Sequence, residues 1–500
     1  MIRIDHLQKS FRSLRVIKDL TTTLPSGSVT AVIGPNGSGK TTLMKSIVGL
    51  VQPDSGSIEV DGTTTINNPS SRMHIGYMSQ VARYPENLTP TDLIQMVRGV
   101  RTGLTTDIAD ELIADMQLED HMKKPMRALS GGTRQKVGAV IAFMFRPTTL
   151  LLDEPTAGLD PVVTERLKER ISSLRDGGTT ILITSHVLSE IQELADRIIY
   201  LHEGLVMFDG AGPRTPCSNR SYISFEVCGI YHVERIGRCA MRTTSLLLKY
   251  VVRDVMRSKW LGLYLIFFAA VTEGLLFFTA GEAKTVVGLM NVVLLLIPLA
   301  AAVFGTLHVH HNRDFVELML TQPVSRNAIY VALYLGVSLP FLIAFVVGIG
   351  VPAAVHGVLL TAPILTLLAT GCALTMVFFA IAYLIGVVVQ DKAAAMGVAF
   401  ISWLSFAVLY DGVILVLTVL FADYPLEKAT IAMVVCNPID LARIIVMLTF
   451  DYAALMGYTG AVFQEFFGTA TGVVISSCSL IVWTLLPVFI GRRAFGRKDW

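Results

Sequence analysis

This sequence lacks closely spaced cysteine pairs. It also lacks a surplus of charge of one sign and a cluster of basic residues along one segment. The chain of 500 residues has six cysteines but no Cys-X-X-Cys pair, which argues against a structural zinc site and favours free thiols. Its 41 Lys and Arg residues nearly balance 39 Asp and Glu residues, so we expect no nucleic-acid partner. The opening MIRIDHLQKS lacks an apolar core behind a basic head, unlike a secretory signal.

Charged residues are scarce as well, and their scarcity is uneven along the chain. They make up 16% of the sequence, whereas hydrophobic residues make up 52%. Residues 1–212 have the mixed texture of a soluble α/β domain, and from about residue 260 apolar runs reach the roughly 20 residues that a membrane-crossing helix needs. We therefore predict a soluble domain at 1–212, a linker at 213–240 and a membrane domain at 241–500.

A glycine-rich turn separates an apolar strand at 29–33 from an amphipathic helix. The glycines let the backbone wrap around phosphate oxygens near the positive end of that helix. The pattern GxxxxGK[ST] predicts Lys40 at the β- and γ-phosphates, Thr41 on Mg²⁺ and Thr42 near the α-phosphate. The predicted loop consists of Gly34, Pro35, Asn36, Gly37, Ser38, Gly39, Lys40, Thr41 and Thr42.

Two carboxylates follow a second buried strand, in TTLLLDEPTAGLD. A parallel strand that ends in aspartate suits Mg²⁺ coordination in a nucleoside triphosphate site, which assigns that role to Asp153. Glu154 can then act as the general base that polarises the attacking water. A solvated strand end is the alternative for an isolated Asp-Glu pair.

Together these motifs resemble the nucleotide-binding domain of ATP-binding cassette (ABC) transporters across residues 1–212. The resemblance implies ATP and Mg²⁺ as cofactors. It places Phe11 against adenine, although a core phenylalanine of a β-strand is the alternative. It also places Gln80 at Mg²⁺ and the attacking water, and His186 beside the γ-phosphate as a further catalytic residue.

The segment LSGGTRQKV, at residues 129–137, is explained by the same resemblance. Ser130, Gly131 and Gly132 begin a helix whose free amides and hydroxyl can hold a γ-phosphate. In the family this phosphate belongs to the partner's nucleotide, and Asp160 couples the two sites. A simple helix N-cap is the alternative for Ser130. Since the chain carries one such domain, the resemblance implies a homodimer.

The apolar half predicts an all-α domain with six spans, at about 260–280, 286–307, 328–352, 363–389, 394–421 and 469–491. A basic amphipathic helix at 246–259 precedes them. Lys and Arg concentrate in the loops on one side, which predicts that both termini face the cytoplasm and that the protein lies in the inner (cell) membrane. The predicted fold is thus an α/β P-loop domain followed by a six-span domain.

The loop HVHHNRDFVELMLTQPVSRNAIY resembles the coupling segment of ABC-2 permeases, in which a short helix docks beside the Gln80 loop. The segment NPIDLARI, at 437–444, is similar to the permease of the transporter that matures nitrous-oxide reductase, a copper enzyme. The cluster of His308, His310 and His311 invites a copper site, but solvated histidines are the more frequent case.

Glu273 and Asp411 lie at membrane depth, where a charge is expensive and often functional. Either carboxylate could line a substrate pathway, or could be paired at a helix interface.

These features lead to three hypotheses for function. The first is ATP-driven export, or force transmitted through the membrane, in maturation of nitrous-oxide reductase. The second is an ABC-2 exporter of a lipid, drug or small peptide. The third is a machine that moves no cargo and acts on a periplasmic partner protein through residues 423–467. A further alternative is a soluble ABC protein that acts on ribosomes. The predicted spans exclude it unless the membrane half results from an artificial joining of two separate proteins.

Overall fold

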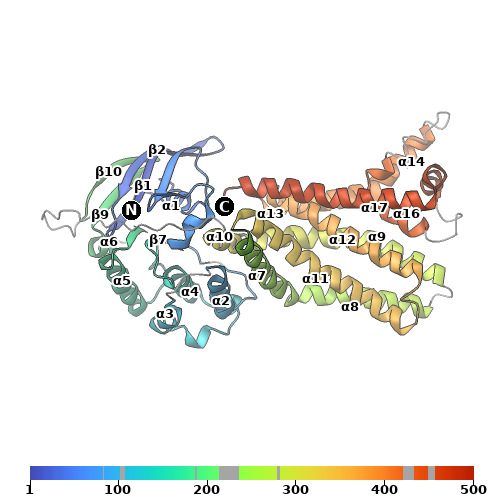
Figure 1. Cartoon of the computed structure of the whole chain (residues 1–500), viewed down its shortest axis with the longest axis horizontal. Coiled ribbons are helices and arrows are strands. Elements are labelled where there is room, and N and C mark those ends of the chain that lie inside the picture. Colours follow the sequence, from blue (N-terminus) through green and yellow to red (C-terminus); the bar gives the residue numbers. More distant parts are fainter. Residues whose placement is uncertain are drawn as a thin grey trace. The chain divides into compact units, whose positions relative to one another are not determined.

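A computed structural model of the chain describes all residues except 83, 102–106, 186–187, 213–235, 279–281, 421–432 and 449–456. The chain divides into two compact units (Figure 1). The first contains Met1–Tyr250, Asn312–Ile329 and Asp499–Trp500, and the second contains Val251–His311 and Tyr330–Lys498. Two short segments from the apolar half of the sequence therefore belong to the first unit.

A ten-stranded sheet organises the first unit, with its strands in the order β5-β4-β1-β2-β10-β9-β3-β8-β7-β6. The strands are β1 (Ile2–Phe11), β2 (Leu14–Leu24), β3 (Val29–Ile33), β4 (Ser55–Val60), β5 (Thr63–Thr64), β6 (Ile75–Met78), β7 (Thr149–Asp153), β8 (Thr180–Thr184), β9 (Arg197–His202) and β10 (Leu205–Ala211).

The unbroken apolar segments form the parallel part of this sheet. Strands β9, β3, β8, β7 and β6 pair in parallel, and β3, β7 and β8 are buried along almost their whole length. Parallel strands are covered on both faces, which explains their continuous Val, Ile and Leu. Strand β1 instead alternates buried and exposed residues and pairs antiparallel with β2 and β4.

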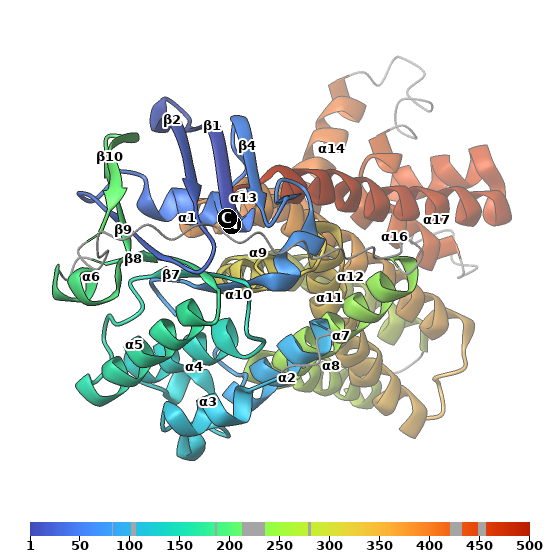
Figure 2. The same ribbon diagram turned by 60° about the vertical axis from the view of Figure 1, so that its left-hand side comes forward.

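Helices surround the sheet within the first unit. Figure 2 shows β1, β2 and β4 at one end of this unit and α3, α4 and α5 at the other. The helices are α1 (Lys40–Val48), α2 (Pro90–Val100), α3 (Ala109–Asp115), α4 (Gly131–Phe143), α5 (Pro161–Asp176), α6 (Leu188–Leu194) and α10 (Arg313–Leu320), with short 3-10 turns at Pro69–His74, Glu119–His121 and Met126–Ala128.

The second unit is entirely helical among its described residues. Helix α7 (Ile236–Met256) enters it, and the remaining elements are α8 (Lys259–Phe278), α9 (Glu282–His311), α11 (Arg326–Val355), α12 (Ala362–Val388), α13 (Lys392–Leu404), a π-helical turn (Ser405–Leu409), α14 (Tyr410–Leu420), α16 (Pro438–Leu448) and α17 (Gly457–Arg497). Within the described residues, six helices are long and apolar enough to cross a membrane, which agrees with the six predicted spans.

Three boundaries differ from the sequence-based expectation. Helix α7 begins at Ile236, inside the segment predicted as a linker. The fifth span is interrupted by the π-helical turn, where one additional residue is accommodated in the helix. The last helix, α17, runs from Gly457 to Arg497 and so starts well before the predicted sixth span. Apolar length alone locates the part of a helix that suits lipid, not where the helix begins.

Candidate nucleotide site

The glycine-rich turn connects β3 directly to the first residue of α1. Gly34, Gly37 and Gly39 have φ angles of 154°, 80° and 106°. A Cβ atom on Gly39 would lie 3.0 Å from the carbonyl oxygen of Val16, and its left-handed φ disfavours any other residue. The backbone shape that the motif predicts is therefore present, and it depends on glycine.

Lys40 lies folded against the loop that precedes it. Its Nζ donates hydrogen bonds to the carbonyl oxygens of Gly34, at 2.7 Å, and Pro35, at 3.1 Å. Burial lowers the pKa of Lys40, while the nearby carboxylates of Glu154 and Asp153 raise it. The ammonium thus sits inside the loop, within electrostatic reach of both acidic residues.

Asp153 lies at the buried end of β7. Its Oδ1 accepts a hydrogen bond of 2.5 Å from the hydroxyl of Thr184, which is its register partner on β8. Burial raises the pKa of Asp153, and hydrogen bonds from Thr184 and Thr41 lower it. The contact with Thr41 brings together the hydroxyl and the carboxylate that the sequence assigns to Mg²⁺. Hydroxyl and carboxylate oxygens are the ligand types this ion takes.

The backbone of Glu154 is held in an unusual conformation next to Asp153. Its φ is 50°, in the left-handed region, which costs a non-glycine residue on the order of 1 kcal/mol or more. Its amide donates at 3.1 Å to both the carbonyl oxygen and the hydroxyl of Thr184. Thr184 therefore holds the carboxylate of Asp153 and the backbone of Glu154. Sequence reasoning missed this residue, although a polar residue at the end of a buried apolar strand was a usable signal.

The structure places the remaining predicted residues of the chain's own site as follows. Gln80 is exposed, two residues after the end of β6, whose Met78 pairs with Leu152 of β7. Phe11 ends β1 and is 37% exposed, so its ring is not part of the core. The Nζ of Lys9 lies 5.1 Å from the centroid of that ring. His186 lies outside the described residues.

Ser130 caps α4, as the alternative interpretation of this residue expects. Its hydroxyl accepts a hydrogen bond of 3.2 Å from the Thr133 amide. Gly131 is exposed, and a Cβ on Gly132 would collide with the carbonyl oxygen of Gly158. A capping role is compatible with phosphate binding by the free amides of the same helix end.

Asp160 is connected to the same helix. Its Oδ2 pairs with Lys136 Nζ at 2.9 Å, and its Oδ1 caps α5 by accepting a 3.0 Å bond from the Val163 amide. The Lys136 ammonium, together with that amide, holds the pKa of Asp160 below its usual value. The segment 130–136 and the segment 158–160 therefore form one connected surface element.

The predicted coupling segment lies within the first unit. Glu317 of α10 pairs with Lys45 of α1 at 2.7 Å. The Oε1 of Gln322 accepts a 2.7 Å hydrogen bond from Nε of Arg101, whose burial lowers its pKa to about 10. A pocket beside α10 is lined by Ser79, next to Gln80, and by Glu317 itself. The coupling helix therefore adjoins the Gln80 loop.

The two carboxylates predicted at membrane depth are both paired. Glu273 Oε1 lies 2.9 Å from His356 Nε2. Asp411 lies 3.1 Å from Arg443, which also pairs with Asp440 at 2.9 Å. The paired interpretation therefore describes both carboxylates in this structure.

The three histidines at the end of α9 are not gathered into one group of metal-ligand residues in the described part of the chain. Throughout the part of the chain that the structure describes, no three His, Cys, Asp or Glu residues are grouped so as to hold a metal ion. His310 instead contacts the carbonyl oxygen of Thr306 through Nδ1, at 3.0 Å.

Comparison with known proteins assigns a family to each half of the chain. The family model described as "ABC transporter" matches residues 17–157, and the model described as "ABC-2 family transporter protein" matches residues 251–500. The lantibiotic transport ATP-binding protein SrtF of Streptococcus pyogenes is 35% identical over 212 residues, which is 42% of this chain and 90% of that protein.

Two further similarities concern the same region. The lipopolysaccharide export system ATP-binding protein LptB of Haemophilus influenzae is 34% identical over 218 residues, with 42% of this chain and 90% of that protein covered. A solved structure of an ATP-binding subunit of an ABC transporter is 28% identical, covers 42% of this chain and 90% of that chain, and superimposes with a TM-score of 0.40.

Proposed function

The chain belongs to the ABC-2 family of transporter proteins and also carries an ABC ATPase domain, and we propose that it exports an amphipathic compound of the peptide, lipid or drug class. It is a multi-pass membrane protein that hydrolyses ATP with Mg²⁺. Its relatives include proteins of lantibiotic transport and of lipopolysaccharide export, which supports a cargo of this kind.

One observation carries the proposal: the segment 312–329, which joins α9 to α11, contacts α1. The Glu317–Lys45 pair connects α10 to the helix that begins with the phosphate-binding Lys40 and Thr41. Movement of α1 on nucleotide binding is therefore transmitted into the segment between two membrane helices.

The proposal assigns a chemical role to each predicted site residue. Asp153, Thr41 and Gln80 would hold Mg²⁺, and Glu154 would polarise the attacking water; the family resemblance assigns His186 a place near the γ-phosphate. Phe11 stacks on adenine, and Ser130 with its two glycines holds the nucleotide of the partner subunit in a homodimer. The charge bias of the loops supports the proposal that both termini lie in the cytoplasm and that the protein lies in the inner membrane.

Transport into sealed vesicles tests the proposal. In inside-out vesicles that contain the purified chain, ATP should drive uptake of a fluorescent amphipathic peptide or lipid. Glu154→Gln should retain ATP binding but abolish both hydrolysis and uptake, because the attacking water loses its base. Hydrolysis at the full rate in this variant would refute the assignment of Glu154. Hydrolysis in the native chain without uptake of any cargo, but stimulated by a periplasmic protein, would favour force transmission instead.

A second candidate is maturation of nitrous-oxide reductase, with copper or sulfur species as cargo. It rests on residues 437–444, where Asn437 and Asp440 are buried and Arg443 joins Asp440 to Asp411. Copper and sulfur analysis of the purified chain, with and without ATP, tests it. Nucleotide-dependent retention of either element would favour this candidate over an amphipathic cargo.

A further inference from the structure

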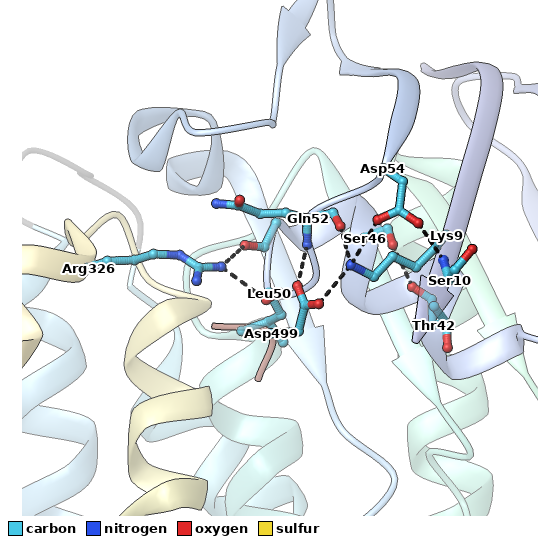
Figure 3. A network of polar contacts seen from close by, with 10 residues as sticks. Lys9, Ser10, Thr42, Ser46, Leu50, Gln52, Asp54, Arg326 and Asp499 are labelled. Atoms are coloured by element: carbon cyan, nitrogen blue, oxygen red, sulfur yellow. Dashed lines mark hydrogen bonds and ion pairs between the residues drawn. The ribbon is translucent and has the colours of Figure 1, made fainter. Parts of the chain in front are cut away.

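Residues 499–500, which are separated from the end of α17 by Lys498, lie on the ATPase domain. Asp499 Oδ2 pairs with Lys9 Nζ at 2.7 Å, and its Oδ1 accepts a 3.0 Å hydrogen bond from the Gln52 amide (Figure 3). Trp500 is 4% exposed, and its backbone oxygen lies 3.4 Å from Lys45 Nζ. Both residues are therefore held by side chains and backbone of the first unit.

The surface that they contact is the C-terminal end of α1 and the segment after it. Arg326, at the start of α11, contacts the same end of α1. Its guanidinium donates hydrogen bonds to the carbonyl oxygens of Gly49, at 3.2 Å, and Leu50, at 3.0 Å (Figure 3). A cation is favourable at a helix C-terminus, where carbonyl groups lack partners within the helix. The residues that follow α17 and the first residue of α11 thus meet at one end of α1.

Asp499 is also connected, through Lys9, to Phe11, the residue predicted to stack on adenine. Lys9 is 5% exposed, and besides Asp499 its Nζ contacts the carbonyl oxygen of Gln52 at 2.7 Å and Asp54 at 3.5 Å. The same Nζ lies 5.1 Å from the ring centroid of Phe11. A buried ammonium depends on its anionic partners. The position of Lys9 beneath Phe11 is therefore set in part by Asp499.

We propose that Asp499 and Trp500 are positioning residues that connect the last membrane helix to α1, and so form a second transmission contact beside α10. This inference rests on the proposed function, because it assigns a role within transport driven by ATP. Helix α1 has nine residues and is about 14 Å long at 1.5 Å per residue. A helix this short moves as a rigid rod, so displacement at its phosphate-binding end appears at its clamped end.

The contact of Asp499 and Trp500 with the end of α1 is called the clamp here. It is tested with Asp499→Asn in the full chain, reconstituted in vesicles. The amide keeps an oxygen for the Gln52 amide but removes the charge that pairs with Lys9. We expect ATP hydrolysis to continue, while the amount of cargo moved per ATP falls about fivefold, at the lower end of measured coupling effects. Asp499→Glu should restore it. Asp5→Asn is the matched control, since it removes an exposed ion pair with Arg3 from the same strand as Lys9.

A second readout separates this inference from the proposed function. With the six native cysteines replaced by serine, Arg493→Cys places a single thiol at an exposed position of α17 beyond the predicted sixth span, so its rate of maleimide labelling in an otherwise native chain reports movement of that helix. ATP should change this rate in the native chain and in Asp5→Asn, but much less in Asp499→Asn. If native vesicles hydrolyse ATP without moving cargo, the export proposal fails and the labelling still tests the clamp. An equal response to ATP in native and Asp499→Asn protein would overturn the clamp.

Discussion

Thr184 contacts both acidic residues of the nucleotide site, through the carboxylate of Asp153 and the backbone amide of Glu154. Its hydroxyl bonds Asp153 at 2.5 Å and the Glu154 amide at 3.1 Å. Burial raises the pKa of Asp153, and the hydrogen bond from Thr184 opposes that rise. Because Mg²⁺ needs the deprotonated carboxylate, protonation of Asp153 must reduce activity as the pH falls.

Thr184→Val should therefore move the acid limb of the ATPase pH profile to higher pH. Loss of a hydrogen bond to a charged group costs about 1.5–3 kcal/mol, and one pKa unit corresponds to about 1.4 kcal/mol, so we expect the limb to move by about one to two pH units. The profile is measured at saturating ATP over a range of Mg²⁺ concentrations. High Mg²⁺ should partly reverse the shift, because the ion competes with the proton.

Thr30→Val on the neighbouring strand β3 provides the matched control. The Thr30 hydroxyl is buried and, in the part of the chain that the structure describes, has no hydrogen-bond partner. Its removal should leave the profile unchanged. An acid limb that is identical in the Thr184 and Thr30 variants would mean that Asp153 does not control the pH dependence.

At the scale of elements, the docking of α10 depends on a buried polar contact as well as on the Glu317–Lys45 pair. Arg101 is 5% exposed and donates to Gln322 at 2.7 Å, with its other nitrogens bonded to the carbonyl oxygens of Met73 and Ile75. Gln322→Leu removes the acceptor and leaves part of a buried guanidinium without a partner. This costs about 1–3 kcal/mol.

We expect Gln322→Leu to hydrolyse ATP but to lose its stimulation by cargo, because the coupling segment no longer stays seated. The measurement is ATPase activity in vesicles with and without transported compound. Ser325→Ala, three residues away, removes an exposed hydrogen bond to the Ala328 amide and should retain stimulation. Full stimulation in the Gln322 variant would argue against transmission through this contact.

The sequence predicted those elements whose signal is local. The phosphate loop, the strand before Asp153 and the six apolar helices each carry their pattern within about 20 residues. The partners of Gln322 and Asp499 could not be predicted, since Arg101 and Lys9 are separated from them by 221 and 490 residues. The pairing of Asp411 with Arg443 could not be predicted either, because membrane depth indicates the cost of a charge but not its partner.

For the whole molecule, the main question is how many chains complete one nucleotide site. Within the chain, Ser130 caps its own helix through Thr133, and Lys136 of that helix pairs with Asp160. These contacts are compatible with a helix end that receives phosphate from a second chain. One chain carries one loop at 34–42 and one segment at 129–137, so a homodimer would contain two shared sites.

A mixed dimer of Lys40→Ala and Ser130→Ala chains distinguishes shared from separate sites. With shared sites, the intact loop of the Ser130 variant faces the intact segment of the Lys40 variant, so one site remains complete and about half of the ATPase activity should return. With separate sites, each chain carries a defect in its own site and the mixture stays inactive. Differently tagged chains, purified in tandem, give the required heterodimer. Loss of the helix cap costs roughly 1 kcal/mol in Ser130→Ala, but this cost is equal in the homodimer and cannot produce the recovery.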